Sequence, residues 1–347
     1  MKTRSRLRYA AILVGAALLA TGAAACGSSS PASSGPSAGG SSSGSRVDTT
    51  SVRVAYDSQP DIGDLPSLAA MKIMRDEGYN INQQVLNGSS VTADAVSTGS
   101  AQMASLNGIS VFQAVNKGNS FVAFAEKYTN EEVLVTKSSI TSVGQLAGAT
   151  VSVQSPDATS TSLVLYTEKT NNLQVKFVYQ PNSATRAAAL VSGQVDASPL
   201  EFDDVDKILG ETGSNYHVLI YYDKTLPWIL GNVFFTSKSF MSAHKSIVQA
   251  FVNALAQADQ AAYADPNGFL ATYGSLLTGY TPSVLKQSMD ESAAGKIWGT
   301  NRGALLATDV QKTLSFDKTD GLLTGAQVSQ LTSAEPSWLA SMTPTSS

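Results

Sequence analysis

The sequence is poor in the residues from which catalytic and metal sites are usually built. Its 347 residues include one cysteine and two histidines, and only 14% of them are charged. A single cysteine excludes an internal disulfide, so packing has to stabilise the fold. His217 and His244 lack the close spacing of metal ligands, and the phosphate-binding motifs G-x-G-x-x-G and the P-loop are absent. We therefore expect no metal and no cofactor.

Signals for catalysis and for nucleic-acid binding are missing as well. Cys26 lies in a tract of glycine and serine without a histidine nearby, which argues against a cysteine nucleophile. The G-x-S-x-G pattern at residues 40–44 lies in the same tract, whereas that motif works only on a strained turn between a strand and a helix. No cluster of basic residues indicates a nucleic-acid partner. We expect no catalytic residues and no enzyme.

The first residues of the sequence have the pattern of a targeting segment. An apolar run at residues 10–20 and small residues up to Cys26 follow four basic residues, Lys2, Arg4, Arg6 and Arg8. The run is much shorter than the roughly twenty residues that span a bilayer, which predicts a signal peptide at residues 1–25. Its removal takes away four basic residues and no acidic one, so the formal net charge falls from −4 to −8.

Cys26 and the tract behind it resemble the start of a bacterial lipoprotein, whose precursor is cut before a cysteine that carries the lipid. The sequence Ala-Ala-Ala-Cys at 23–26 has alanine where the lipobox usually has Leu, Val or Ile, so a secretory peptide cut near Ala25 is the alternative. Residues 27–45 are only serine, glycine, proline and alanine, which predicts disorder. The resemblance implies that residues 26–46 are a lipidated cysteine and a tether, which hold the protein at the outer face of the cell membrane through the lipid alone.

An internal repeat predicts the architecture. Residues 93–105 align without gaps on residues 187–199, and each copy predicts a helix ended by a glycine, Gly99 or Gly193, and followed by a short buried strand. A chance match between small residues is the alternative. The same order of elements surrounds both copies, with strands at 52–55 and 151–153, helices at 65–77 and 158–170, and strands at 82–86 and 176–180. This alternation predicts an α/β fold with two lobes, each a mostly parallel sheet flanked by helices.

The chain is expected to cross between the two lobes more than once. We expect the first part of lobe one at residues 47–136, lobe two at 137–231, and a return to lobe one with extra C-terminal helices at 232–340. A long amphipathic helix with apolar residues from Ile247 to Ala262 belongs to this last part. Two crossing segments would form a hinge, and we expect a monomer.

Several segments carry a more specific resemblance. Residues 143–151, 190–197, 248–266 and 321–323 are similar to segments of solute-binding proteins of ABC importers, in the type II class and its nitrate, sulfonate, taurine and thiamine-precursor branch (SsuA/THI5-like). The resemblance implies a two-lobed periplasmic-binding-protein fold outside the cytoplasm. It also implies that hinge closure captures a small organic molecule for delivery to an ABC permease. The alternatives are an exported enzyme or a surface sensor on the same fold.

Candidate ligand residues follow from the sheet architecture. Ligands of open α/β sheets lie beyond the carboxyl ends of the strands, where loops and helix N-termini meet. In lobe one this rule selects Tyr56, Asp57, Ser58, Asn87, Ser89, Asn107 and Gly108. In lobe two it selects Ser155, Asp157, Thr159, Asn182, Glu201 and Phe202. Trp228 joins them because it directly precedes the expected return crossing.

The chemistry of these loops bears on the ligand. Ser89 and residues 155–159 are rich in hydroxyl groups and precede helices, so they either bind an oxyanion or cap the helix. The loops are also acidic and contain no lysine or arginine, although for any one of these acidic residues solvated surface is the favoured alternative. We expect a neutral, amine-bearing or heteroaromatic ligand that stacks on Tyr56, Phe202 or Trp228 and donates to Glu201. A sulfonate is the alternative.

Overall fold

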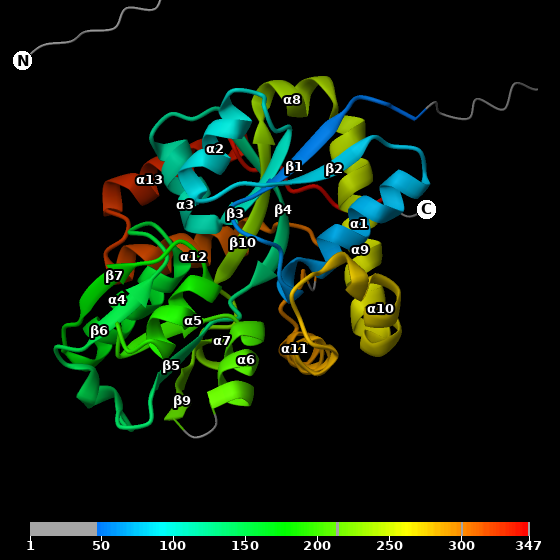
Figure 1. The fold of residues 1–347 in the computed structure, drawn as a ribbon. Helices are drawn as coiled ribbons and strands as arrows, with labels where there is room; N and C mark the ends of the chain where they lie inside the picture. The colour runs from blue at the N-terminus through cyan, green and yellow to red at the C-terminus, as the bar shows by residue number, and fades with distance from the viewer. Residues whose placement is uncertain (1–46, 213–214, 300, 346–347) are drawn as a thin grey trace, which may run out of the picture. The chain divides into compact units, whose positions relative to one another are not determined.

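The computed structural model describes residues 47–212, 215–299 and 301–345, which Figure 1 shows as a ribbon. The chain divides into two units after residue 45. The expected signal peptide at 1–25, the expected lipidation site Cys26 and the expected tether at 26–46 lie outside the described residues. Within the described ranges, every helix is too short or too polar to pass through a bilayer.

The first sheet has five strands. β1 (Val52–Tyr56) pairs in parallel with β2 (Ile81–Val85) and β3 (Met103–Asn107), and β10 (Leu230–Ser237) runs antiparallel between β3 and β4 (Phe121–Thr129). The helices that follow the first three strands are α1 (Leu65–Asp76), α2 (Ser89–Ser97) and α3 (Gly108–Asn116). β3, β4 and β10 are buried almost throughout, as expected of strands that have both faces covered.

The second sheet repeats this strand order with another part of the chain. β6 (Thr150–Val153) pairs in parallel with β7 (Lys176–Tyr179) and β8 (Ala197–Leu200), and β5 (Val133–Lys137) runs antiparallel between β8 and β9 (Tyr216–Tyr221). Its helices are α4 (Thr159–Asn171), α5 (Ser183–Val191), α6 (Phe202–Thr212) and α7 (Tyr222–Thr225). The fold class expected from the sequence, α/β with two sheets flanked by helices, is confirmed (Figure 1).

The internal repeat occupies equivalent places in the two sheets. Its helices are α2 and α5, and its strands are β3 and β8, each of which is the third strand in its sheet order. Gly99 and Gly193 follow the two helices with φ angles of 75° and 78°. This left-handed conformation is unfavourable for residues with a Cβ atom, so the glycine of each copy is explained by the turn that ends its helix.

The last third of the chain is helical. It contains α8 (Lys238–Ala243), α9 (Lys245–Ala264), α10 (Pro266–Tyr273), α11 (Pro282–Gly295), α12 (Ala307–Asp320) and α13 (Gly325–Ala334). Short 3-10 helices are η1 (Ile62–Asp64), η2 (Val143–Leu146), η4 (Gly274–Leu276) and η5 (Glu335–Ser337). The apolar stripe expected on α9 is buried, and α9 packs on α1 (Figure 1). α11 packs on α6 and α12 on α4, so this part of the chain also contacts lobe two.

Two short segments join the lobes, residues 130–132 (the first crossing) and residues 226–229 (the second crossing). The Asn130 backbone N–H donates to the Ile229 carbonyl at 2.8 Å, and its side-chain amide donates to the Leu226 carbonyl at 3.4 Å. Because β5 pairs within the second sheet, the first crossing comes before the lobe boundary expected at residue 136. Paired crossings of this kind can flex as one hinge.

Lobe one buries two carboxyl groups outside the space between the lobes. Glu126 on β4 and Asp259 on α9 are only 3% and 1% exposed. Burial raises the pKa of Glu126 to about 8, and burial together with Glu126 raises the pKa of Asp259 well above its usual range. Between the ordinary glutamate pKa of about 4.3 and the folded value, unfolding therefore releases a proton, and the free energy of unfolding decreases as the pH rises.

The Glu126→Gln variant should lose part of this pH dependence, because the amide remains uncharged at every pH. Through this one group we expect the wild-type protein to lose roughly 2 kcal/mol of stability between about pH 5 and pH 7, and the variant to avoid that loss. Urea denaturation at several pH values measures the difference. Glu77→Gln, at an exposed position, is the control and should keep the wild-type slope. Identical slopes for all three proteins would contradict the prediction.

Candidate ligand-binding cleft

The candidate site lies between the two lobes beside the crossings. It consists of two adjoining cavities of about 20 Å³ each, which together we call the central cleft. A cavity of this size holds roughly one water molecule, so the lobes are closed on each other. Its polar lining comprises Tyr56, Asp57, Ser58, Asp61, Asp64, Asn107, Lys127, Tyr128, Thr129 and Asn232 of lobe one, Asn130, Glu131 and Glu132 of the first crossing, and Gln154, Thr159, Asn182, Ser183, Arg186 and Glu201 of lobe two.

Many of the ligand residues selected from the sequence lie in this region. Those that line the central cleft are Tyr56, Asp57, Ser58, Asn107, Thr159, Asn182 and Glu201. Ser89 and Asp157 line a neighbouring pocket of about 160 Å³ formed by α2, α3 and the loop before α4. The fold therefore brings together, in one cleft, residues from both lobes that were selected because they follow the carboxyl ends of strands.

The other selected residues lie elsewhere. Phe202 lines a separate pocket described below. Trp228 packs edge-on against a phenylalanine ring of α12, with 5.8 Å between the ring centroids. Gly108 begins α3, where an added Cβ would lie 3.5 Å from a β10 side chain. Asn87 is exposed, and the Ser155 hydroxyl donates to a carboxylate of its own loop at 2.7 Å.

Sequence reasoning missed residues that a strand, a helix and the first crossing bring to the cleft. Lys127 comes from the end of β4, Arg186 from the first turn of α5, and Glu131 and Glu132 from the first crossing. The selected loops contain no base, whereas the cleft contains these two. The sequence contained one indication of Lys127, Glu131 and Glu132, because a charged and polar run at residues 126–132 directly continues an apolar strand.

Lys127 is buried in an ion pair with Asp64, and the two side chains are 4% and 3% exposed. Burial opposes the charge of the ammonium group, but Asp64 and Asp61 outweigh it and raise the pKa of Lys127. The Nζ atom also lies 4.4 Å from the ring centroid of Tyr128 and 5.5 Å from that of Tyr56. The charge of this lysine is therefore balanced inside the protein.

Arg186 is the second base and is 1% exposed. Its guanidinium donates to Glu132 Oε1 at 3.2 Å, and its Nε donates to the Pro199 carbonyl at 2.9 Å. Burial raises the pKa of Glu132, although Arg186 opposes the shift. The pair holds the first crossing against lobe two.

Other carboxyl groups of the cleft form no ion pair with a lysine or arginine of the described residues. Asp57 accepts hydrogen bonds from Ser89 Oγ at 2.9 Å and Gln154 Nε2 at 3.1 Å, and burial raises its pKa. Burial and the neighbouring carboxylates raise the pKa of Asp61 well above its usual range. Burial raises the pKa of Glu201 to about 8 despite the opposing charge of a neighbouring arginine. The central cleft is thus an acidic environment.

Hydrogen bonds cross the cleft directly from lobe to lobe. Asn107 of β3 donates from Nδ2 to Gln154 Oε1 at 3.3 Å, and the Thr159 N–H at the start of α4 donates to Asn107 Oδ1 at 2.9 Å. The Ser110 hydroxyl donates to the Asp157 carbonyl at 2.8 Å. The first N–H of α4 therefore already donates to an uncharged side chain inside the protein.

One group of carboxylates converges closely enough for a metal ion. Glu201, Asp203 and Asp204 have ligand atoms within 4.8 Å of one another, and no other such group occurs in the described ranges. Lys207 Nζ donates to Asp203 Oδ2 at 3.2 Å and to Asp204 Oδ1 at 3.0 Å, and it lies 4.2 Å from the ring centroid of Tyr280. The N-terminus of α6 and this lysine balance much of the charge of the group.

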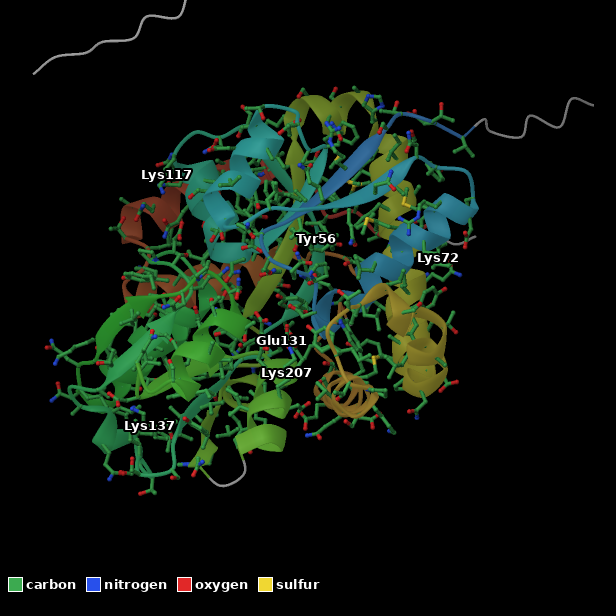
Figure 2. The ribbon with its side chains drawn as sticks, viewed as in Figure 1. Tyr56, Lys72, Lys117, Glu131, Lys137 and Lys207 are labelled. Atoms are coloured by element: carbon green, nitrogen blue, oxygen red, sulfur yellow. The ribbon has the colours of Figure 1, made fainter. Side chains whose placement is uncertain are left out.

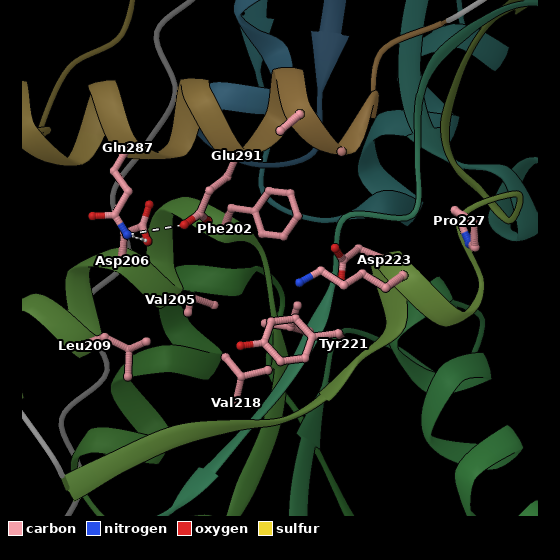
Figure 3. A pocket seen from close by; sticks show the side chains of 14 residues that line it. Phe202, Val205, Asp206, Leu209, Val218, Tyr221, Asp223, Pro227, Gln287 and Glu291 are labelled. Carbon is pink, nitrogen blue, oxygen red and sulfur yellow. Dashed lines mark hydrogen bonds between the residues drawn. The ribbon is translucent and has the colours of Figure 1, made fainter.

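A larger pocket of about 590 Å³ lies between α6, α7, β9 and α11 (Figure 3). Phe202, Val205 and Val218 give it an apolar wall, and Gln287 of α11 donates to Asp206 Oδ1 at 2.7 Å at its edge. None of its lining residues belongs to the central cleft. This pocket is therefore separate from the central cleft, although it also lies between lobe two and a C-terminal helix.

Several solved structures have a fold similar to that of this chain. The chain is similar to the alkanesulfonate-binding protein SsuA from Xanthomonas axonopodis pv. citri bound to MOPS, with a TM-score of 0.67, 18% identity and coverage of 85% of this chain and 100% of that one. The ligand-binding component of an ABC-type import system from Staphylococcus aureus, with zinc bound, gives a TM-score of 0.67 and 16% identity over 78% and 92% of the two chains.

A third similar structure is the Candida albicans CA3427 gene product, described as having the generic periplasmic binding protein fold. Its TM-score is 0.65, at 16% identity over 86% of this chain and 98% of that one. These likenesses establish a two-lobed periplasmic-binding-protein fold. No curated protein matches the chain. Residues 75–268, more than half of the chain, match the model of the NMT1/THI5 like family, and the chain belongs to that family.

The Lys127→Met variant should lower the free energy of unfolding by about 3 to 5 kcal/mol, because it leaves the buried carboxylate of Asp64 without its counter-ion. Chemical denaturation measures the loss, and the double variant with Asp64→Asn should recover part of it. Lys72→Met is the matched control, since Lys72 pairs with Asp76 on the surface of α1 and should contribute less than about 1 kcal/mol. Equal losses for the two lysine variants would contradict this account.

Proposed function

We propose that this protein is the extracytoplasmic solute-binding component of an ABC importer. It captures a small organic molecule between its lobes by hinge closure and delivers it to a permease. The observation that carries this proposal is the central cleft, where polar side chains from both lobes meet beside two hydrogen-bonded crossings. The family and the similar structures support the same function.

Hinge closure is supported by the hydrogen bonds between the lobes. Asn107 contributes to two of them, with Gln154 and with the Thr159 N–H, and all three residues line the cleft. A ligand that enters between open lobes is enclosed when these bonds form, and a permease can then recognise the closed state.

The polar groups of the cleft favour an amine-bearing or heteroaromatic ligand over a sulfonate. Both hydroxyl-rich helix starts are engaged inside the protein, because the Ser89 hydroxyl donates to Asp57 and the Thr159 N–H donates to Asn107. Asp57, Asp61 and Glu201 supply acceptors for N–H donors of a ligand.

The protein acts as a monomeric binding protein rather than as an enzyme, and no cofactor takes part in its function. The signal peptide at residues 1–25 directs its export. A lipid on Cys26 then holds it at the outer face of the membrane, with residues 27–45 as a flexible tether. An exported enzyme or a surface sensor on this fold is the competing function, and a neighbouring gene for a permease and an ATPase would separate transport from sensing.

Asn107→Ala should weaken ligand binding about tenfold and leave the ligand-free protein more open, because it removes hydrogen bonds between the lobes. Small-angle scattering and titration calorimetry against a metabolite panel measure compaction and affinity. Asn82→Ala, at an exposed position on β2, is the control and should behave as the wild type. Absence of compaction with every member of a broad panel would overturn the proposed function.

Cys26→Ala should release the protein from the membrane fraction and leave ligand affinity unchanged, because the lipid would be the only anchor. Fractionation of cells that express the full chain, followed by immunoblotting, measures the release. Ser30→Ala in the same tract is the control and should stay with the membrane. A wild-type protein that is already free in the soluble fraction would remove the lipid anchor from this proposal.

A further inference from the structure

Glu131 lies in the first crossing and lines one of the cavities of the central cleft. Glu131 is only 2% exposed, and neither of its carboxylate oxygens has a hydrogen-bond partner in the described residues. Figure 2 labels it between Tyr56 of the first sheet and Lys207 of α6. Burial of a carboxylate without a partner is strongly unfavourable, so such a group needs a proton or a cation beside it.

The protein itself supplies no cation for Glu131. Lys127 pairs with Asp64 and lies over two tyrosine rings, and Arg186 donates to Glu132 and to a backbone carbonyl. No basic side chain of the described residues forms an ion pair with Glu131 within 4.0 Å. When this carboxyl group is ionised, its counter-charge must therefore come from outside the described protein.

The surroundings of Glu131 add negative charge. Asp57, Asp61 and Glu201 also line the cleft, and none of them pairs with a lysine or arginine. In a closed, poorly hydrated cleft these charges interact more strongly than they would in water. A cation would stabilise the ionised form of these carboxyl groups, whereas an anionic ligand would be repelled by any of them that is ionised.

We propose that the captured molecule is a small organic cation with N–H donors, such as an amine, amidine or guanidine, and that Glu131 is the residue that binds its charged group. This proposal rests on the proposed function, since it names the class of molecule that the lobes enclose. Asp61 and Glu201 accept its remaining N–H donors.

An organic cation fits this arrangement better than a metal ion does. The carboxylates that converge within 4.8 Å are Glu201, Asp203 and Asp204, and Glu131 is not among them. Two of those three already accept hydrogen bonds from Lys207. The unpaired carboxyl groups are instead distributed around the cleft, which suits a group with several N–H donors that point in different directions.

The test uses the full chain and probes that share one carbon skeleton. We propose calorimetric titration with butylamine, butylguanidine, butanol and butanesulfonate, together with zinc and calcium chloride. The cationic organic probes should bind and the sulfonate should not. Glu131→Gln should weaken their binding at least tenfold. Glu126→Gln removes a buried carboxyl group outside the cleft, and it should leave affinity unchanged even where stability changes.

A second readout distinguishes a ligand contact from a structural effect of the variant. Burial raises the pKa of Glu131, with Glu201 and Asp203 of lobe two and Asp64 of η1 adding to the shift and Lys127 of β4 opposing it. A cation that binds the ionised carboxylate therefore displaces a proton, and affinity should increase as the pH rises. Titrations in buffers with different ionisation enthalpies should show proton release for the wild type and less release for Glu131→Gln.

The outcomes separate this inference from the proposed function. Compaction with butanesulfonate alone would overturn the cationic class and leave the solute-binding function standing. Binding of zinc or calcium alone would replace the organic cation with a metal ion. Unchanged affinity and proton release in Glu131→Gln would remove Glu131 from the site. If no probe binds the wild-type protein, the cationic class is overturned, and scattering with the wider panel then decides whether the proposed function fails with it.

Discussion

The arrangement of the lobes depends on two backbone segments that lie side by side, the first crossing at 130–132 and the second crossing at 226–229. β10 returns to the first sheet between β3 and β4, and β5 enters the second sheet between β8 and β9. Each sheet therefore contains an antiparallel strand next to a crossing. This places Glu131 and Glu132 between the lobes, where any motion of the hinge changes their surroundings.

Electrostatics is the second constraint on the cleft. Lys127 and Arg186 each balance one carboxylate, and both are too buried to exchange these partners for solvent. The remaining carboxyl groups make the closed cleft acidic. Burying them in ionised form is unfavourable unless protons or a cation neutralise them. Burying unpaired carboxylates is unfavourable, and a positively charged ligand would compensate for it when the lobes close.

Much of the fold could be predicted from local signals. Gly99 and Gly193 marked equivalent turns, and the spacing of apolar residues identified α9 and most strands of both sheets. The position of β5 could not be predicted, because a short apolar strand fits either sheet equally well by pattern. For the cleft, the strand-end rule selected Asn107 and Glu201, but it could not select Lys127, whose neighbours come from η1 and β1.

The sequence by itself indicated the class of architecture and predicted a signal peptide, since both depend on residues that are close together in the chain. It also indicated the acidic character of the ligand loops. Only the tertiary structure decided which acids are balanced, because an ion pair such as Arg186 with Glu132 joins residues 54 positions apart. The unpaired state of Glu131 emerges only when every neighbouring base has been assigned its partner.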